Sequence, residues 1–229
     1  MRLRILTTTY LGQTQYYRGE YERVVELATD NLAPADWVYE SFGSAQRASV
    51  VGRIWLALSL AELGRFAEAA EYGAEAIRLV EPTRHAFDIG VAHRHAATLH
   101  LLKGDWAKAR SVIEHGISVF RTANVGAALL PSAIASFAWV LAQLGEANEA
   151  LNRIQESEQL VERQAMRGGI RLGRAYYSLG RACLLLGRLD EARRLSAHAV
   201  ESSSRYPGDA AHAQHLLGDI ATHPDRFDA

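Results

Sequence analysis

The sequence predicts an all-α protein, a right-handed solenoid of about five helical hairpins followed by a terminal helix. Three observations lead to this prediction. A glycine-centred motif recurs five times at nearly constant spacing, the apolar residues between its copies follow the helical period, and the alternating pattern of a strand is absent. A fixed period of this length is typical of repeat architectures, in which each unit buries its apolar face against its neighbours.

The motif consists of Gly, any residue, a bulky apolar residue, two further residues and a small residue. Three copies are clear, at Gly19–Val24, Gly64–Ala69 and Gly104–Ala109. Two weaker copies follow at Gly145–Ala150, which lacks the bulky residue, and at Gly187–Ala192. The glycines are 45, 40, 41 and 42 residues apart, so the copies form one regular array.

Each part of the motif has a role in a helical hairpin. Glycine can take the left-handed conformation that ends the first helix. The bulky residue then packs at the turn, and the small residue lets the second helix approach closely. A further small residue stands seven positions before each glycine, where we expect the close contact of the first helix; these residues are Gly12, Ala57, Ala97, Ala138 and Gly180.

Proline and glycine between the hairpins mark the junctions. We expect a single repeat domain over residues 1–229, with repeats at about 1–44, 45–84, 85–127, 128–168 and 169–206. Residues 207–229 read as a first helix without its partner, either a cap or part of a longer array. The expected helices are near 3–17, 20–31, 46–63, 67–80, 86–102, 107–122, 132–144, 148–164, 170–186, 190–204 and 209–222.

Composition limits where the protein acts. A hydrophobic content of 48% is enough to bury a core, and a net charge of −1 gives no bulk attraction to nucleic acid or to an anionic membrane. No stretch approaches the ~18 apolar residues of a spanning helix, and the first residues do not read as a signal peptide. We therefore expect a cytoplasmic protein that binds neither nucleic acid nor membrane. The one cysteine, Cys183, lies in an apolar run and is expected to be buried.

The sequence carries no recognisable catalytic or cofactor site. It has no Gly-Lys dipeptide, which excludes a Walker A motif, and no nucleophile elbow. His93 and His95 point apart on a helix, and His212 and His215 have suitable spacing but no further ligand nearby in the sequence. We predict no metal, no cofactor and no enzymatic activity.

The segments Leu56–Ala69, Leu99–Arg110 and Ala175–Ala192 give the chain a family resemblance. It resembles the tetratricopeptide repeat (TPR) family over essentially its whole length, although the TPR period is ~34 residues and HEAT or armadillo repeats have ~40–47. The Gly-x-aromatic-x-x-Ala turn is similar to the TPR form. The same segments look like the helical-repeat region that follows the ATP-binding module in bacterial signalling proteins, including adenylate/guanylate cyclases.

The resemblance implies a protein-interaction scaffold that binds a peptide, a helix or a sister domain in a concave groove lined by the first helices. The arginines of this groove are candidate anion contacts, and its aromatic residues are candidate apolar anchors. The family's groove positions correspond to Thr9, Gln13, Tyr16, Ile54, Leu58, Arg94, Thr98, Ala135, Trp139, Tyr177 and Arg181, with Arg174 one turn earlier. The predicted partner-binding residues among them are Gln13, Tyr16, Arg94, Trp139, Arg174, Tyr177 and Arg181.

Two alternatives stay open. The chain could instead be a small-ligand sensor module of a larger ATPase, cyclase or transcription regulator. A monomer is the default, but a dimer would form through the last helix if Leu216, Leu217 and Ile220 were uncovered.

Overall fold

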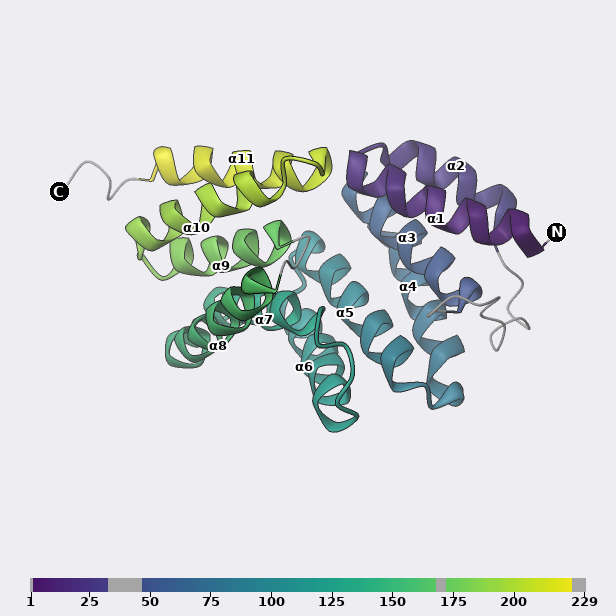
Figure 1. The fold of residues 1–229 in the computed structure, drawn as a ribbon, viewed down its shortest axis with the longest axis horizontal. Coiled ribbons are helices and arrows are strands. Elements are labelled where there is room, and N and C mark those ends of the chain that lie inside the picture. The colour runs from purple at the N-terminus through teal and green to yellow at the C-terminus, as the bar shows by residue number, and fades with distance from the viewer. Residues whose placement is uncertain (1, 33–46, 168–171, 224–229) are drawn as a thin grey trace. The chain divides into compact units, whose positions relative to one another are not determined.

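The computed structural model describes residues 2–32, 47–167 and 172–223, and every regular element within these ranges is helical (Figure 1). The predicted all-α fold is therefore confirmed, and each expected helix has a counterpart whose ends differ by only a few residues. A short 3-10 helix, η2 (Glu81–Thr83), follows α4. The α-helices are α1 (Arg2–Arg18), α2 (Tyr21–Asn31), α3 (Ala48–Glu62), α4 (Phe66–Val80), α5 (Ala86–Lys103), α6 (Trp106–Thr122), α7 (Leu130–Gln143), α8 (Ala147–Met166), α9 (Gly173–Leu185), α10 (Leu189–Ser202) and α11 (Pro207–Ala221).

The chain divides into two compact units, Met1–Gly126 and Ala127–Ala229, which we call unit 1 and unit 2. Unit 1 consists of three antiparallel hairpins, α1–α2, α3–α4 and α5–α6, and within it α1 packs against α3 and α3 against α5. The break between the units falls at the predicted junction of the third and fourth repeats. The individual repeat boundaries stay predictions.

Unit 2 repeats the same arrangement with two hairpins, α7–α8 and α9–α10. Helix α11 packs against both α9 and α10, so it occupies the place of the first helix in a further hairpin. No helix in the described part of the chain is long and apolar enough to cross a membrane.

The glycine motif forms the five hairpin turns as predicted. All five turn glycines are left-handed, with φ between 72° and 79°. In each turn the residue after the glycine donates its N–H to the carbonyl five residues earlier, as from Arg65 to Leu60 at 2.8 Å and from Asp105 to His100 at 2.9 Å. This is the hydrogen bond of a Schellman cap, and it satisfies a helix-end carbonyl that would otherwise have no partner.

The small residues of the motif are the closest packing points of each hairpin. Val24, Ala69, Ala109, Ala150 and Ala192 are all fully buried. The facing position has little room in the α9–α10 hairpin, because a Cβ on Gly180 would lie 2.9 Å from Leu216 Cδ2 and 3.0 Å from Ser196 Oγ. The bulky turn residues are less buried than expected, and Trp106 is only partly covered.

First and second helices have different surroundings. In α7, a first helix of 14 residues, the buried positions run almost without a break from Pro131 to Ala142, because neighbouring helices cover it on several sides. In α8, a second helix of 20 residues, only Ala150, Ile154, Ser157 and Val161 are buried. The second helices are therefore amphipathic outer helices with one buried stripe.

The last helix does not offer an uncovered apolar face of the kind that the dimer alternative requires. Leu216 and Ile220 are buried within unit 2, and Leu217 is partly buried. Pairing through this helix would require these side chains to be uncovered, and Leu216 and Ile220 are not. The monomeric state stays a prediction.

Cys183 lies in the core of unit 2, as expected, and burial raises the pKa of its thiol to about 12 from the ordinary 9.0. Since the thiolate is the reactive form, we expect the native chain at pH 8 to react with a disulfide reagent such as DTNB only as fast as unfolding exposes Cys183. The chain denatured in guanidinium should react at once. Equal rates for the two forms, followed by absorbance, would contradict the burial.

Candidate functional site

Four of the predicted partner-binding residues form one cluster in unit 2. Trp139 of α7 and Tyr177 of α9 make an edge-to-face contact with ring centroids 5.7 Å apart. The guanidinium carbon of Arg181 lies 5.4 Å from the centre of the Trp139 ring, and that of Arg174 lies 6.0 Å from the Tyr177 ring. We call these four residues the unit 2 cluster. Cation–π geometry of this kind stabilises both the arginines and the rings.

Helix α11 supplies acidic partners for both arginines of the cluster. Arg174 Nη1 lies 3.5 Å from Asp209 Oδ1, and Arg181 forms an ion pair with Asp219. Both arginine side chains are only partly exposed. An anionic ligand would therefore have to compete with these aspartates, so the arginines are less available as anion contacts than the sequence suggested.

The aromatic members of the cluster differ in exposure. Trp139 is buried, whereas Tyr177 is partly exposed and also contacts the ring of His212 on α11, with centroids 5.5 Å apart. The sequence did not identify His212 as part of this surface. Trp139 consequently acts as a support for the surface, and Tyr177 with the edges of the arginines forms the accessible part.

Two of the predicted residues of unit 1, Tyr16 and Arg94, are connected through Trp55 and His95, which are not among the predicted partner-binding residues. Tyr16 is buried, and its hydroxyl donates a hydrogen bond to Glu62 at 3.2 Å. The ring of Trp55 lies between Tyr16 and His95, with centroid distances of 5.3 and 5.5 Å. A guanidinium nitrogen of Arg94 lies 2.7 Å from His95 Nε2.

Other groove positions that the family register places in unit 1 differ in their burial. Gln13 is partly exposed, whereas Ile54 and Leu58, which the family register places in the groove, are buried in the core. Both lie on α3, which packs against α1, α2, α4 and α5 and has little free surface.

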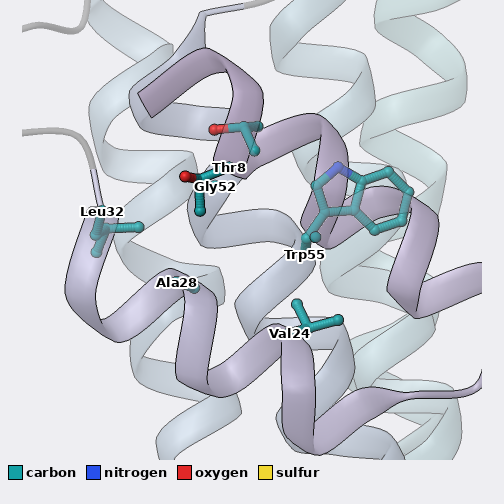
Figure 2. Close-up of a pocket in the computed structure, with 8 residues that line it drawn as sticks. Thr8, Val24, Ala28, Leu32, Gly52 and Trp55 are labelled. Atoms are coloured by element: carbon teal, nitrogen blue, oxygen red, sulfur yellow. The ribbon is translucent and has the colours of Figure 1, made fainter. Parts of the chain in front are cut away.

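A small cavity lies beside Trp55 in unit 1 (Figure 2). Its volume is about 20 Å³, which is room for about one water molecule. It is too small for a metabolite or a peptide side chain. The lining residues are Thr8, Thr9, Gly12, Val24, Ala28, Leu32, Gly52 and Trp55.

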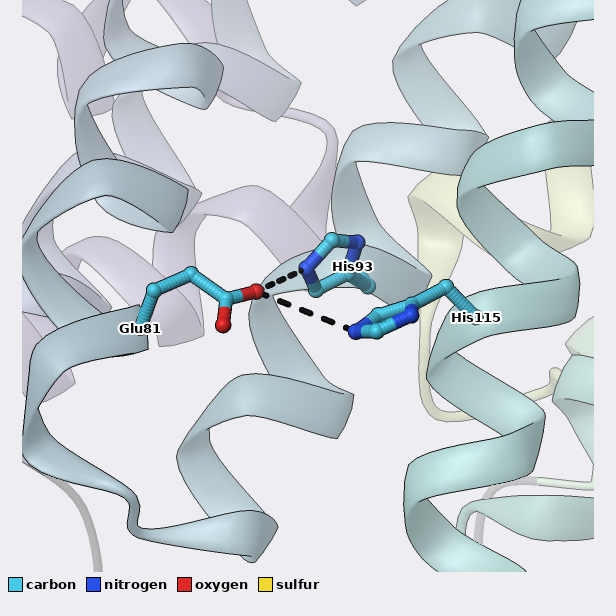
Figure 3. A group of neighbouring side chains, drawn as sticks. All are labelled: Glu81, His93 and His115. Atoms are coloured by element: carbon cyan, nitrogen blue, oxygen red, sulfur yellow. Dashed lines mark hydrogen bonds and ion pairs between the residues drawn. The ribbon is translucent and has the colours of Figure 1, made fainter.

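A second group in unit 1 joins Glu81, His93 and His115 (Figure 3). Glu81 Oε1 lies 2.7 Å from His93 Nε2 and 3.8 Å from His115 Nε2, and the two imidazole centroids are 4.4 Å apart. Burial lowers the pKa of His93, against the opposing effect of its hydrogen bond to Glu81.

The sequence did not suggest this group, because it compared histidines only along one helix. His93 and His95 do point apart, as predicted, since His95 Nδ1 lies 2.7 Å from the Val91 carbonyl while His93 faces Glu81. A usable signal was present in the repeat register. His93 lies eleven residues before the turn glycine Gly104 and His115 eleven residues after it, and such positions meet in an antiparallel hairpin.

The comparisons with known proteins agree with this architecture. A tetratricopeptide repeat family model matches residues 50–71, which cover most of α3 and the start of α4 in unit 1, and residues 173–197, which cover α9 and most of α10 in unit 2. The fold is TPR-like. The matched segments contain the glycine turns at Gly64 and Gly187, so the TPR-like signal coincides with the motif.

Solved structures extend the TPR-like fold over most of the chain. A Podosopora anserina protein with nearly identical TPR-like repeats has a TM-score of 0.58 at 16% identity, covering 88% of this chain and 95% of its own. A thermophilic TPR protein of Thermus thermophilus has a TM-score of 0.56 at 20% identity, with 93% and 98% covered. At sequence identities this low, structural similarity establishes the fold and not the function.

Rap proteins are also similar in fold. A Rap protein complexed with competence and sporulation factor has a TM-score of 0.62 at 15% identity, covering 95% of this chain and 64% of that one. The apo form of RapI has a TM-score of 0.63 at 11% identity, with 94% and 85% covered. No curated protein matches the sequence.

Proposed function

We propose that this TPR-like chain is a protein-interaction scaffold that binds an extended peptide or a helix of a partner protein, with the unit 2 cluster as its main contact. The observation that carries the proposal is the contact among four side chains on two adjacent first helices, those of Trp139, Tyr177, Arg174 and Arg181. Tryptophan, tyrosine and arginine are the residue types enriched at interface hot spots.

The structure suggests how the cluster would bind. Tyr177 presents a partly exposed ring that is held from behind by Trp139, so little conformational entropy is lost when a partner side chain packs on it. Carboxylates of the partner could replace Asp209 and Asp219 at the two arginines. Because one ion pair replaces another, we expect aromatic packing to supply most of the affinity and charge to supply selectivity.

Three further considerations support the proposal or add to it. One similar structure is a Rap protein in complex with competence and sporulation factor, so a fold of this class can hold a bound factor. Gln13, Tyr16 and Arg94 stay predicted contacts of unit 1 taken by itself, where the burial of Tyr16 makes it a support and not an accessible surface. The sequence resemblance to bacterial signalling proteins favours a role for the scaffold in a cytoplasmic signalling or regulatory pathway, without an enzymatic activity of its own.

The proposal can be tested with a phage-displayed peptide library selected on the purified chain. We expect selected peptides to lose about 2 kcal/mol or more of binding free energy to Tyr177→Ala and to Arg181→Ala, measured by calorimetry. Trp139 is left unchanged because its burial would confuse binding with folding. Arg193→Ala is the matched control, since Arg193 of α10 is an exposed arginine paired with Asp190 at 3.3 Å.

Peptides that bind the Tyr177 and Arg181 variants as tightly as wild type would reject the unit 2 cluster as the contact. A selection that enriches no peptide would weaken the scaffold function itself. For the small-ligand sensor alternative, the cavity beside Trp55 would not be the ligand site, because it has room for about one water molecule.

A further inference from the structure

Three consecutive elements of unit 1 bring three metal-binding side chains to one point. Glu81 is the first residue of η2, at the end of α4, while His93 lies on α5 and His115 on α6. One ligand atom from each residue lies within 4.8 Å of the other two. Figure 3 shows the carboxylate of Glu81 directed toward both imidazoles.

The backbone holds these side chains in place. The N–H of Glu81 donates to the Ile77 carbonyl and so caps α4, and the following Pro82 restricts the chain. Next to His115, a Cβ on Gly116 would lie 3.1 Å from His93 Cβ and 3.3 Å from the Gly90 carbonyl oxygen. The absence of a side chain at Gly116 therefore allows α6 to approach α5 closely enough for the two imidazoles to meet.

The chemistry of the three groups matches a divalent transition metal. Zinc is bound by imidazole nitrogen and carboxylate oxygen at about 2.0–2.2 Å, so tetrahedral ligands lie roughly 3.3–3.5 Å from one another. The observed 2.7 and 3.8 Å from Glu81 to the two histidines lie on either side of this spacing. Small rotations of Glu81 and His115 would equalise them, because those side chains are 44% and 51% exposed, whereas His93 at 12% is fixed.

We propose that Glu81, His93 and His115 form a binding site for a divalent transition-metal ion, with Zn²⁺ as the ion that the ligands fit best. Two histidines and one carboxylate leave a fourth coordination position, which faces solvent beside the exposed Glu81 and His115. An ion here would join α4, α5 and α6 and so fasten the second hairpin of unit 1 to the third.

The surroundings indicate a site of moderate affinity. His93 Nδ1 is buried and has no hydrogen-bond partner among the described residues, so none of their side chains or carbonyls orients this imidazole. Such outer partners typically contribute 10–100-fold to metal affinity. We therefore expect binding weaker than that of a structural zinc site in which every histidine is oriented by an acceptor.

Calorimetric titration of the full, untagged chain with ZnCl₂ tests the proposal. We expect one equivalent to bind to wild type, and a loss of affinity of at least about tenfold in His115→Ala and in Glu81→Gln. His198→Ala is the matched control, because His198 of α10 is similarly exposed, at 47%, and lies 3.9 Å from Glu201. Titration with Co²⁺ should give the visible absorption of a low-symmetry site in wild type and in the His198 variant only.

Absence of saturable zinc binding to wild type would overturn the proposal, and so would unchanged affinity in both His115→Ala and Glu81→Gln. Both substitutions are at well-exposed side chains, and circular dichroism checks that the variants are folded. None of the three ligands belongs to the unit 2 cluster, so this test is independent of peptide binding.

Discussion

Replacing Phe120 with alanine is expected to lower the free energy of unfolding by about 3–5 kcal/mol, the usual cost of deleting a fully buried phenylalanine ring. Phe120 is 1% exposed and lies near the end of α6 in the core of unit 1. Two glycines make room for its ring, because a Cβ on Gly90 would lie 2.4 Å from it and one on Gly126 2.5 Å. A ring enclosed in this way leaves a cavity that the backbone cannot close.

Urea unfolding followed by circular dichroism measures this loss. Leu11→Ala is the control in the same unit, since Leu11 is 42% exposed and its truncation should cost less than about 0.5 kcal/mol. Gly90→Ala should cost about 1–3 kcal/mol in wild type by overpacking, and much less in the Phe120→Ala background, where the ring is absent. Additive costs in this double-mutant cycle would show that Gly90 and Phe120 do not interact as described.

The fold was largely predictable from the sequence because its determinants are local. The Gly-x-bulky-x-x-small motif encodes a Schellman turn and a close helix contact within six residues, and five copies in register define the hairpins. The degree of burial was less predictable. Trp106 is half-buried and Ile54 is core, because coverage depends on how many neighbouring helices surround each helix.

The candidate sites were predictable only in part. The family register placed Trp139, Tyr177 and Arg181 on one face, and the structure brings them into contact. It could not indicate that α11 supplies Asp209 and Asp219 as competing partners, since those pairs join residues 35 and 38 positions apart. The Glu81, His93 and His115 group was missed because it depends on three elements, although the symmetry of two of its members about Gly104 could have revealed it.

Helix α11 should be an integral part of unit 2, and Leu216→Ala tests this. Leu216 is fully buried, and its Cδ2 lies 2.9 Å from the place of a Cβ on Gly180, so it fills the space that this glycine leaves open. We expect its truncation to lower the free energy of unfolding by about 2–5 kcal/mol, as measured by urea denaturation.

Leu185→Ala is the matched control in unit 2, because Leu185 is 42% exposed and loses the same atoms. A cost for Leu216→Ala no greater than that for Leu185→Ala would mean that α11 is only loosely attached. In that case Asp209 and Asp219 would hold Arg174 and Arg181 only part of the time, and the unit 2 cluster would be open to anionic partners. A large cost instead means that a partner must displace aspartates that are fixed on a firmly packed helix.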